Sequence, residues 1–168
     1  MRARDLLSGM GENVQGNMPR PERTVPTSGT MRVRVRYCEC DPMGVAHHAA
    51  YVPWLEMGRT ELLRDAGVSY ADLETAGVFL VIVKLEASYK RPAYYDDLLE
   101  VRTRVVQATR VKLRHEYEVV RVESGAKLGA GIARQGQVGE TLVTATTLLA
   151  SVDRTGRPAA LPEWLAGE

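Results

Sequence analysis

The stretch Ala49–Ala66, AAYVPWLEMGRTELLRDA, predicts a long helix and decides how the rest of the chain can pack. Its large apolar residues recur at intervals of three, four and seven, which places them on one helix face: Tyr51, Trp54, Leu55, Leu62 and Ala66. Pro53 fits only a first helical turn, so we expect the helix to start close to Ala50 and to end at Gly67. Gly58, in the middle, costs about 1 kcal/mol relative to alanine. A close neighbour such as a sheet backbone would explain it.

Segments on either side of this helix have the composition of strands. They are rich in β-branched or aliphatic residues, and two alternate clearly; they cover Met31–Cys38, Val78–Tyr89, Leu98–Val106, Val111–Val122 and Leu142–Val152. The gaps between the later strands are short, so we expect neighbours in the chain to form antiparallel hairpins. A short helix, Tyr70–Ala76, follows Ser69 as its N-cap. The sequence therefore predicts an α+β fold in which a curved antiparallel sheet of five to six strands wraps around the long helix.

The remaining segments have weaker patterns. Residues 1–30 contain three prolines within eight residues and little apolar periodicity, so we expect a disordered leader. We therefore expect one domain over 31–163, followed by a tail over 164–168. We also expect Asp153–Glu168 to pack loosely against the domain, if at all. Ser124–Glu140 holds five glycines and is typical of an elongated hairpin tip. Its contacts cannot be predicted from the sequence.

Composition excludes several classes of protein. The chain has 168 residues, with 22 basic and 21 acidic side chains, so its near-zero net charge gives no reason to expect nucleic acid or an anionic membrane as a partner. No apolar run approaches the roughly 20 residues of a membrane-spanning helix, and the N-terminus lacks the pattern of a secretory signal. Cys38 and Cys40 alternate along one strand and are poorly placed to bridge each other. We therefore expect a reducing, cytoplasmic setting.

The densest group of reactive side chains lies in Tyr37–Tyr51, YCECDPMGVAHHAAY. This segment has two acids, both thiols and two of the three histidines, at a predicted strand-to-helix turn. The start of a helix offers free backbone N–H groups and the positive end of a dipole, which suit an oxyanion. An acid before it can attack a carbonyl or deprotonate the attacking water. Asp41 is the candidate, although Asp before Pro-x-Gly is also a common turn former.

Other readings of the segment are weaker. Cys38 and Cys40 near His47 and His48 suggest zinc, but Cys-x-Cys on one extended strand is not the usual spacing of a structural zinc site, and we expect no metal. Either histidine could have a structural role at the helix start. The sequence contains no Gly-x-Ser-x-Gly element, which argues against an α/β-hydrolase.

Four blocks in order resemble the 4-hydroxybenzoyl-CoA thioesterase family of hot-dog proteins, nearest to the bacterial acyl-CoA thioesterases encoded beside the Tol–Pal genes. The blocks span about residues 32–163 and read Tyr37-x-Glu39-x-Asp41-x-x-Gly44-Val45-x-His47-His48-x-x-Tyr51, Leu55-Glu56-x-x-Arg59-Thr60-Glu61-x-Leu63-Arg64, Tyr89-Lys90-Arg91-Pro92-Ala93-x-Tyr95-Asp96-Asp97-x-Leu99-Glu100 and Arg157-Pro158-x-Ala160-Leu161-Pro162. The resemblance implies a hot-dog fold and hydrolysis of acyl-CoA thioesters without a cofactor.

The resemblance also implies roles in the first block. Asp41 matches the catalytic carboxylate, as nucleophile or general base. His48 matches a histidine that would orient the thioester carbonyl or the attacking water. Gly44 and Val45 match the oxyanion-binding turn, and Tyr37 matches an aromatic residue near the site. His47 departs from the family, where an aromatic residue such as tyrosine is usual, so its role stays open.

Further residues are expected to bind substrate. Coenzyme A carries phosphates, so a basic rim is expected from Lys90, Arg91 and Arg110, and Arg110 falls where the family places a phosphate-contacting arginine. Glu56 is a candidate for positioning substrate, although its position on the helix fits a solvated acid better.

The expected partners are acyl-CoA, with acyl-carrier protein as another thioester donor, and a second copy of the chain. Pairing of sheet edges would give a homodimer, and the resemblance implies assembly to a homotetramer. Two alternatives of the same fold remain, an enoyl-thioester hydratase and a non-catalytic acyl-thioester or protein-binding module. Acyl-chain preference is not encoded in any motif we recognise.

Overall fold

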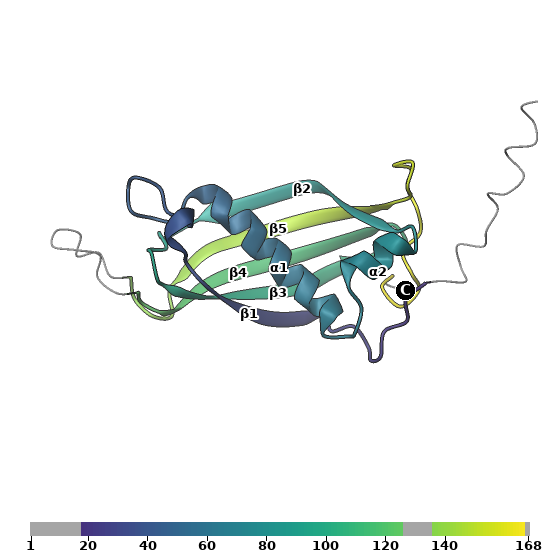
Figure 1. Ribbon diagram of the computed structural model, residues 1–168, viewed down its shortest axis with the longest axis horizontal. Helices are drawn as coiled ribbons and strands as arrows, with labels where there is room; N and C mark the ends of the chain where they lie inside the picture. Colours follow the sequence, from purple (N-terminus) through teal and green to yellow (C-terminus); the bar gives the residue numbers. More distant parts are fainter. Residues whose placement is uncertain (1–17, 126–135, 167–168) are drawn as a thin grey trace, which may run out of the picture.

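The computed structural model describes residues 18–125 and 136–166. Their helices and strands are β1 (Ser28–Arg34), the 3-10 turns η2 (Tyr37–Glu39) and η3 (His48–Ala50), α1 (Tyr51–Arg64), α2 (Tyr70–Thr75), β2 (Phe79–Tyr89), β3 (Leu98–Ala108), β4 (Lys112–Glu123) and β5 (Thr141–Val152). Figure 1 shows two layers, with α1 lying across one face of a single sheet and α2 near one end of it. The α+β class predicted from the sequence is confirmed. Within the described ranges, no helix has the length and apolarity that crossing a membrane requires.

All strand pairs in the sheet are antiparallel, in the order β1-β3-β4-β5-β2. β3 and β4 form the expected hairpin, and β4 pairs with β5. The expectation that every later strand pairs with its neighbour in the chain is wrong for β2, which lies beside β5 at the edge of the sheet. The connection from β2 to β3 therefore crosses the width of the sheet. β1 forms the other edge.

The core lies between α1 and the inner face of the sheet. Trp54 and Leu55 of α1 are fully buried against Leu99 and Val101 of β3 and against Val119 of β4. Close packing explains the mid-helix glycine, because a Cβ atom on Gly58 would lie 2.5 Å from the Thr103 hydroxyl oxygen.

Capping residues and prolines fix where the helices begin. Pro53 occupies the first turn of α1, where the absence of an N–H is tolerated. The Ser69 hydroxyl accepts a hydrogen bond from the Asp72 N–H, and the Asp72 carboxylate accepts one from the Ser69 N–H, which starts α2 as predicted.

The ends of the domain differ from the prediction. β1 spans Ser28–Arg34 and not Met31–Cys38, because the chain turns into η2 at Tyr37. Residues 18–27, placed in the predicted leader, make contacts: the Glu22 N–H donates to the Ala66 carbonyl at 2.9 Å. The C-terminal segment also packs, since Leu161 is buried. The predicted leader over 1–17 and most of the predicted glycine-rich tip, 126–135, lie outside the described residues.

Candidate active site

The turn that carries Asp41 is a small closed loop. An isolated bridge joins Cys40 to Ala46, and within it the Asp41 N–H donates to the Val45 carbonyl at 2.9 Å. The Asp41 carboxylate accepts the Met43 N–H at 2.8 Å. Gly44 has a φ of 77°, which a residue with a side chain rarely adopts, so the glycine is required by the backbone. These hydrogen bonds and the Gly44 backbone conformation fix the shape of the turn and therefore the position of the Asp41 carboxylate.

Two neighbouring segments hold this turn in place. The Ala46 N–H donates to the Ala93 carbonyl at 2.8 Å, and a bridge pairs Val45 with Tyr94. Glu39, just before the turn, accepts hydrogen bonds from the Trp54 indole at 3.0 Å and from the Arg36 side chain at 2.7 Å. Partial burial raises the pKa of Glu39, but these hydrogen bonds outweigh it and the net pKa is lowered. Glu39 is thus an ionised anchor between the turn and α1.

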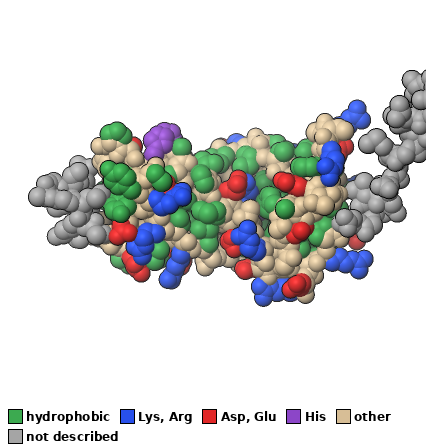
Figure 2. All heavy atoms as spheres, viewed as in Figure 1, with side chains coloured by type: hydrophobic (Ala, Val, Ile, Leu, Met, Phe, Trp, Pro, Cys, Tyr) green, Lys and Arg blue, Asp and Glu red, His purple; other side chains and the backbone are tan. Residues whose placement is uncertain are grey.

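Asp41 and His48 border the same hollow, of about 350 Å³. The hollow is also lined by Val45, Ala46, Tyr51, Tyr89, Lys90, Arg91 and Pro92. The structure therefore brings together five of the predicted site residues, from the turn, from the start of α1 and from the segment after β2: Asp41, Val45, His48, Lys90 and Arg91. Figure 2 shows histidine atoms at the surface in the region where α1 starts.

His48 is fixed by its neighbours. The Tyr89 hydroxyl donates to the His48 carbonyl at 3.0 Å, and the His47 ring lies 4.0 Å from the His48 ring between centroids. His47 caps η3, since its Nδ1 accepts the Ala49 N–H at 3.2 Å. Burial raises the pKa of Tyr51 to about 12, so this residue lines the hollow as a neutral phenol.

Two predicted oxyanion donors are already engaged. The Gly44 N–H donates to the Asp41 carbonyl at 2.9 Å, and the Ala50 N–H donates to the His47 carbonyl at 2.9 Å. Gly44 thus contributes its backbone conformation and not a free N–H. Among the side chains that line the hollow, the His48 imidazole is a polar group beside Asp41.

Four predicted residues do not line this hollow: Gly44, described above, and Tyr37, Glu56 and Arg110. Tyr37 is 75% exposed, and its ring packs edge-on against Tyr95. Glu56 forms an ion pair with Arg59 at 2.9 Å on α1. Arg110 lies in the turn between β3 and β4, roughly 30 Å along the sheet from the hollow, given the 11 residues of β3. Within one chain, Arg110 cannot contact a ligand that is bound at Asp41.

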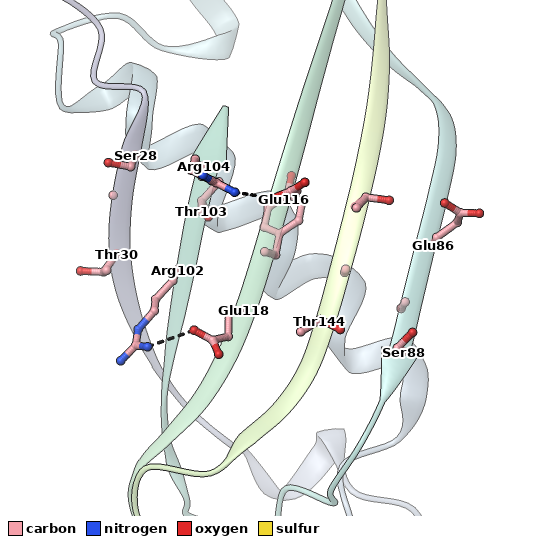
Figure 3. A pocket seen from close by; sticks show the side chains of 15 residues that line it. Ser28, Thr30, Glu86, Ser88, Arg102, Thr103, Arg104, Glu116, Glu118 and Thr144 are labelled. Carbon is pink, nitrogen blue, oxygen red and sulfur yellow. Dashed lines mark hydrogen bonds and ion pairs between the residues drawn. The ribbon is translucent and has the colours of Figure 1, made fainter. Parts of the chain in front are cut away.

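A larger hollow, of about 830 Å³, lies on the sheet face opposite α1 (Figure 3). Its charged side chains are already paired: Arg102 with Glu118 at 3.0 Å and Arg104 with Glu116 at 2.6 Å. It is otherwise lined mostly by small hydroxyl side chains and backbone, without histidine or cysteine. Its third carboxylate, Glu86, pairs with Lys84 at 2.8 Å, so this hollow offers no unpaired carboxylate.

The sequence prediction missed an ion pair beside the site. Arg121 and Asp97 are both buried, and their Nε and Oδ2 atoms lie 2.8 Å apart. The available signal was an arginine within the apolar run Val119–Val122.

The thiols and the metal-binding residue types give no second site. Cys38 and Cys40 are free, and burial raises the pKa of the Cys40 thiol. Among residues 18–125 and 136–166, no group of three or more His, Cys, Asp or Glu side chains is arranged to hold a metal ion.

A helix packed on one face of a five-stranded antiparallel sheet in this order is the hot-dog fold, as predicted. Residues 35–168 match the model of the thioesterase-like superfamily, and the chain belongs to that superfamily.

Known relatives and structures agree with this assignment. The chain is 38% identical over 87 residues to the putative acyl-CoA thioesterase YneP of Bacillus subtilis, covering 52% of this chain and 63% of that protein. It is 36% identical over 92 residues to the acyl-CoA thioester hydrolase YbgC of Escherichia coli O157:H7, covering 55% and 69%. A DHNA-CoA thioesterase structure from Staphylococcus aureus superposes with a TM-score of 0.68 at 27% identity, over 80% of each chain. The match to YneP thus spans less than two thirds of that relative.

Proposed function

We propose that this protein hydrolyses acyl-CoA thioesters to the free acid and coenzyme A. The observation that carries the proposal is the hollow at the start of α1, where Asp41 and His48 face a rim that contains Lys90 and Arg91. Membership of the thioesterase-like superfamily supports a thioester substrate.

In the proposed mechanism, Asp41 acts as nucleophile or general base. As base, the Asp41 carboxylate takes a proton from water while the water oxygen attacks the thioester carbon. The C–S bond then breaks, and the coenzyme A thiolate leaves and is protonated. As nucleophile, the carboxylate attacks the carbon itself, the C–S bond breaks as the coenzyme A thiolate leaves, and water hydrolyses the resulting anhydride. A thiolate is a good leaving group, so neither route needs a Ser-His-Asp triad.

The developing oxyanion is stabilised by the start of α1. The positive end of the helix dipole points toward the hollow. The N–H groups of Gly44 and Ala50 are engaged within the protein, so His48 is the side chain that polarises the carbonyl or orients the water.

Pairing of two β2 edges completes the basic rim. β2 exposes Val81, Ile82 and Val83 at its free edge, which favours antiparallel pairing with a second copy. Across the two-fold axis, the Phe79 end of one β2 lies beside the Tyr89 end of the other. The turn that holds Arg110 lies at the Phe79 end, because Val81 pairs with Ala150 and Ala150 with Lys112. Arg110 of the partner subunit thereby approaches Lys90 and Arg91 and the phosphates of coenzyme A.

The homodimers assemble to a homotetramer through the outer sheet face. On this face, arginines of β3 (Arg102, Arg104) stand beside glutamates of β4 (Glu116, Glu118), as Figure 3 shows. A two-fold axis parallel to the strands and between β3 and β4 places arginines opposite glutamates, so the face is complementary to itself. The mass in solution, measured by light scattering, tests both interfaces.

Replacement of Asp41 by asparagine tests the proposal. The change is nearly isosteric but removes the charge, so we expect Asp41→Asn to lower kcat by about 10²–10⁴-fold with the fold unchanged. Free thiol is measured over a panel of acyl-CoA and acyl-carrier-protein thioesters, with Asp65→Asn at the end of α1 as the matched control. Undiminished turnover in Asp41→Asn contradicts the role of Asp41. Hydration of crotonyl-CoA without thiol release would instead indicate a hydratase, and binding without turnover a binding module.

A further inference from the structure

Arg121, near the end of β4, is a fully buried cation with every side-chain nitrogen bonded. Its Nε donates to the Asp97 carboxylate at 2.8 Å, its Nη2 to the Pro92 carbonyl at 2.5 Å, and its Nη1 to the Glu140 carboxylate. Its guanidinium also lies 5.6 Å from the centre of the Tyr94 ring. A buried charge persists only when its partners are placed this completely. The contacts to Asp97, Pro92 and Glu140 therefore hold the Arg121 guanidinium in one position.

Two partners of Arg121, Pro92 and Tyr94, belong to the segment that supports the Asp41 turn. Pro92 lines the hollow beside Asp41. The next residue, Ala93, accepts the hydrogen bond from Ala46, and Tyr94 bridges to Val45. The Pro92–Tyr94 backbone thus lies between Arg121 and the Asp41 turn. Arg121 contacts it through one hydrogen bond to Pro92 and a cation–π contact with Tyr94, and indirectly through Asp97, whose carboxylate accepts the Tyr94 N–H at 2.9 Å.

Both described ends of the glycine-rich segment dock on the same ion pair. The Gly125 N–H donates to the Asp97 carboxylate at 2.7 Å. A Cβ atom on Gly125 would overlap the backbone of residues 95–97, and one on Gly136 would overlap the Arg121 guanidinium. Glycine at both positions therefore lets the chain pass close to the Arg121–Asp97 pair. The sequence composition alone did not explain why glycine is needed there.

We propose that Arg121 is a positioning residue for the thioesterase reaction, holding the Pro92–Tyr94 backbone against the turn that presents Asp41. This inference rests on the proposed function. Arg121 does not line the hollow, so its effect reaches the substrate only through the placement of Asp41. Misplacement of a reacting group by about 1 Å can cost about 10²-fold in rate.

Two variants and two matched controls test this role. Arg121→Lys keeps the charge but cannot make three separate contacts, and Glu140→Gln weakens one contact at a partly exposed position. We expect kcat to fall about 10–100-fold in the first and about 2–5-fold in the second, with KM changed less than about 3-fold. Arg64→Lys and Glu61→Gln alter an exposed ion pair near the end of α1 and should leave both constants unchanged.

A double variant separates positioning from loss of stability. If Arg121 acts through Asp41, Arg121→Lys adds no further loss to Asp41→Asn, whereas a general weakening of the fold multiplies the two losses. A product of the two losses overturns the proposal, as does wild-type kcat in folded Arg121→Lys. If Arg121→Lys does not fold, Glu140→Gln decides, and its wild-type kcat overturns the proposal. Absence of turnover in the wild-type protein on the whole panel would defeat the proposed function itself, before any variant is compared.

Discussion

Just before α1, Asp41 and His48 line a hollow at the surface, whereas halfway along α1 Arg59 lies buried beside His115 and Tyr117. Both regions hold the residue types of an active site. In the second, the Arg59 Nε and the His115 Nδ1 have no hydrogen-bond partner among the described residues, and burial lowers the pKa of His115 to about 4. Such residue types therefore mark a functional site only where a ligand can reach them.

The largest effect we expect on stability is at His115. Burial, and then the charge of Arg59, lower its pKa from 6.5 to about 4, so the unfolded chain takes up a proton first as the pH falls. Stability is therefore lost from about pH 6.5 down to about pH 4, by about 3 kcal/mol for 2.5 pKa units. In His115→Gln this part of the pH dependence disappears.

Urea unfolding at pH 7 and pH 4 measures this loss. The difference between the two pH values should shrink by about 3 kcal/mol in His115→Gln and little in His48→Gln, an exposed histidine at the start of α1. If the two variants lose the same amount of this pH dependence, burial does not distinguish His115 from His48.

A smaller effect is expected at Gly58, also in the buried middle of α1. Alanine gains about 1 kcal/mol in helix propensity, but its methyl group would lie 2.5 Å from the Thr103 hydroxyl oxygen. Overpacking costs about 1–3 kcal/mol, so we expect Gly58→Ala to be destabilised by about 1 kcal/mol. The pair Gly58→Ala with Thr103→Ala should lose less than the sum of the single changes. Stabilisation by Gly58→Ala alone would show that the helix can move off the sheet.

The smallest effect is expected at His47, at the open start of α1. His47→Ala removes the ring that caps the Ala49 N–H and should cost about 0.5–1 kcal/mol in thermal or urea unfolding. His47→Asn can restore the cap and should recover most of this. Equal stability of the two variants would mean that the cap contributes nothing.

Local features of the fold could be predicted, and distant pairings could not. Period and capping residues determine α1, α2 and the approximate strand ranges, because these signals lie within one segment. β2 was expected beside β3, yet it pairs with β5, which no local pattern encodes. The packed C-terminal segment was missed for the same reason, since Leu161 is buried by contacts from far along the chain.

The candidate site shows the same division. Asp41, His48, Lys90 and Arg91 meet as predicted because short connections link them to the same end of the sheet. Arg110 was expected with them, but a sequence motif does not show at which end of the sheet a residue lies. Arg121 was missed because a register shift between Val119 and Val120 interrupts the alternation of β4.

The position of β2 has a consequence for biosynthesis. β2, which contains the apolar sequence FLVIV, is complete 52 residues before β5 starts, counting from Tyr89 to Thr141; among the described strands β5 is its only partner in the sheet. At about 5–20 residues per second, the strand waits roughly 3–10 s without that partner. A nascent chain that stalls before Thr141 displays an unpaired apolar strand, the feature that chaperones and proteases recognise.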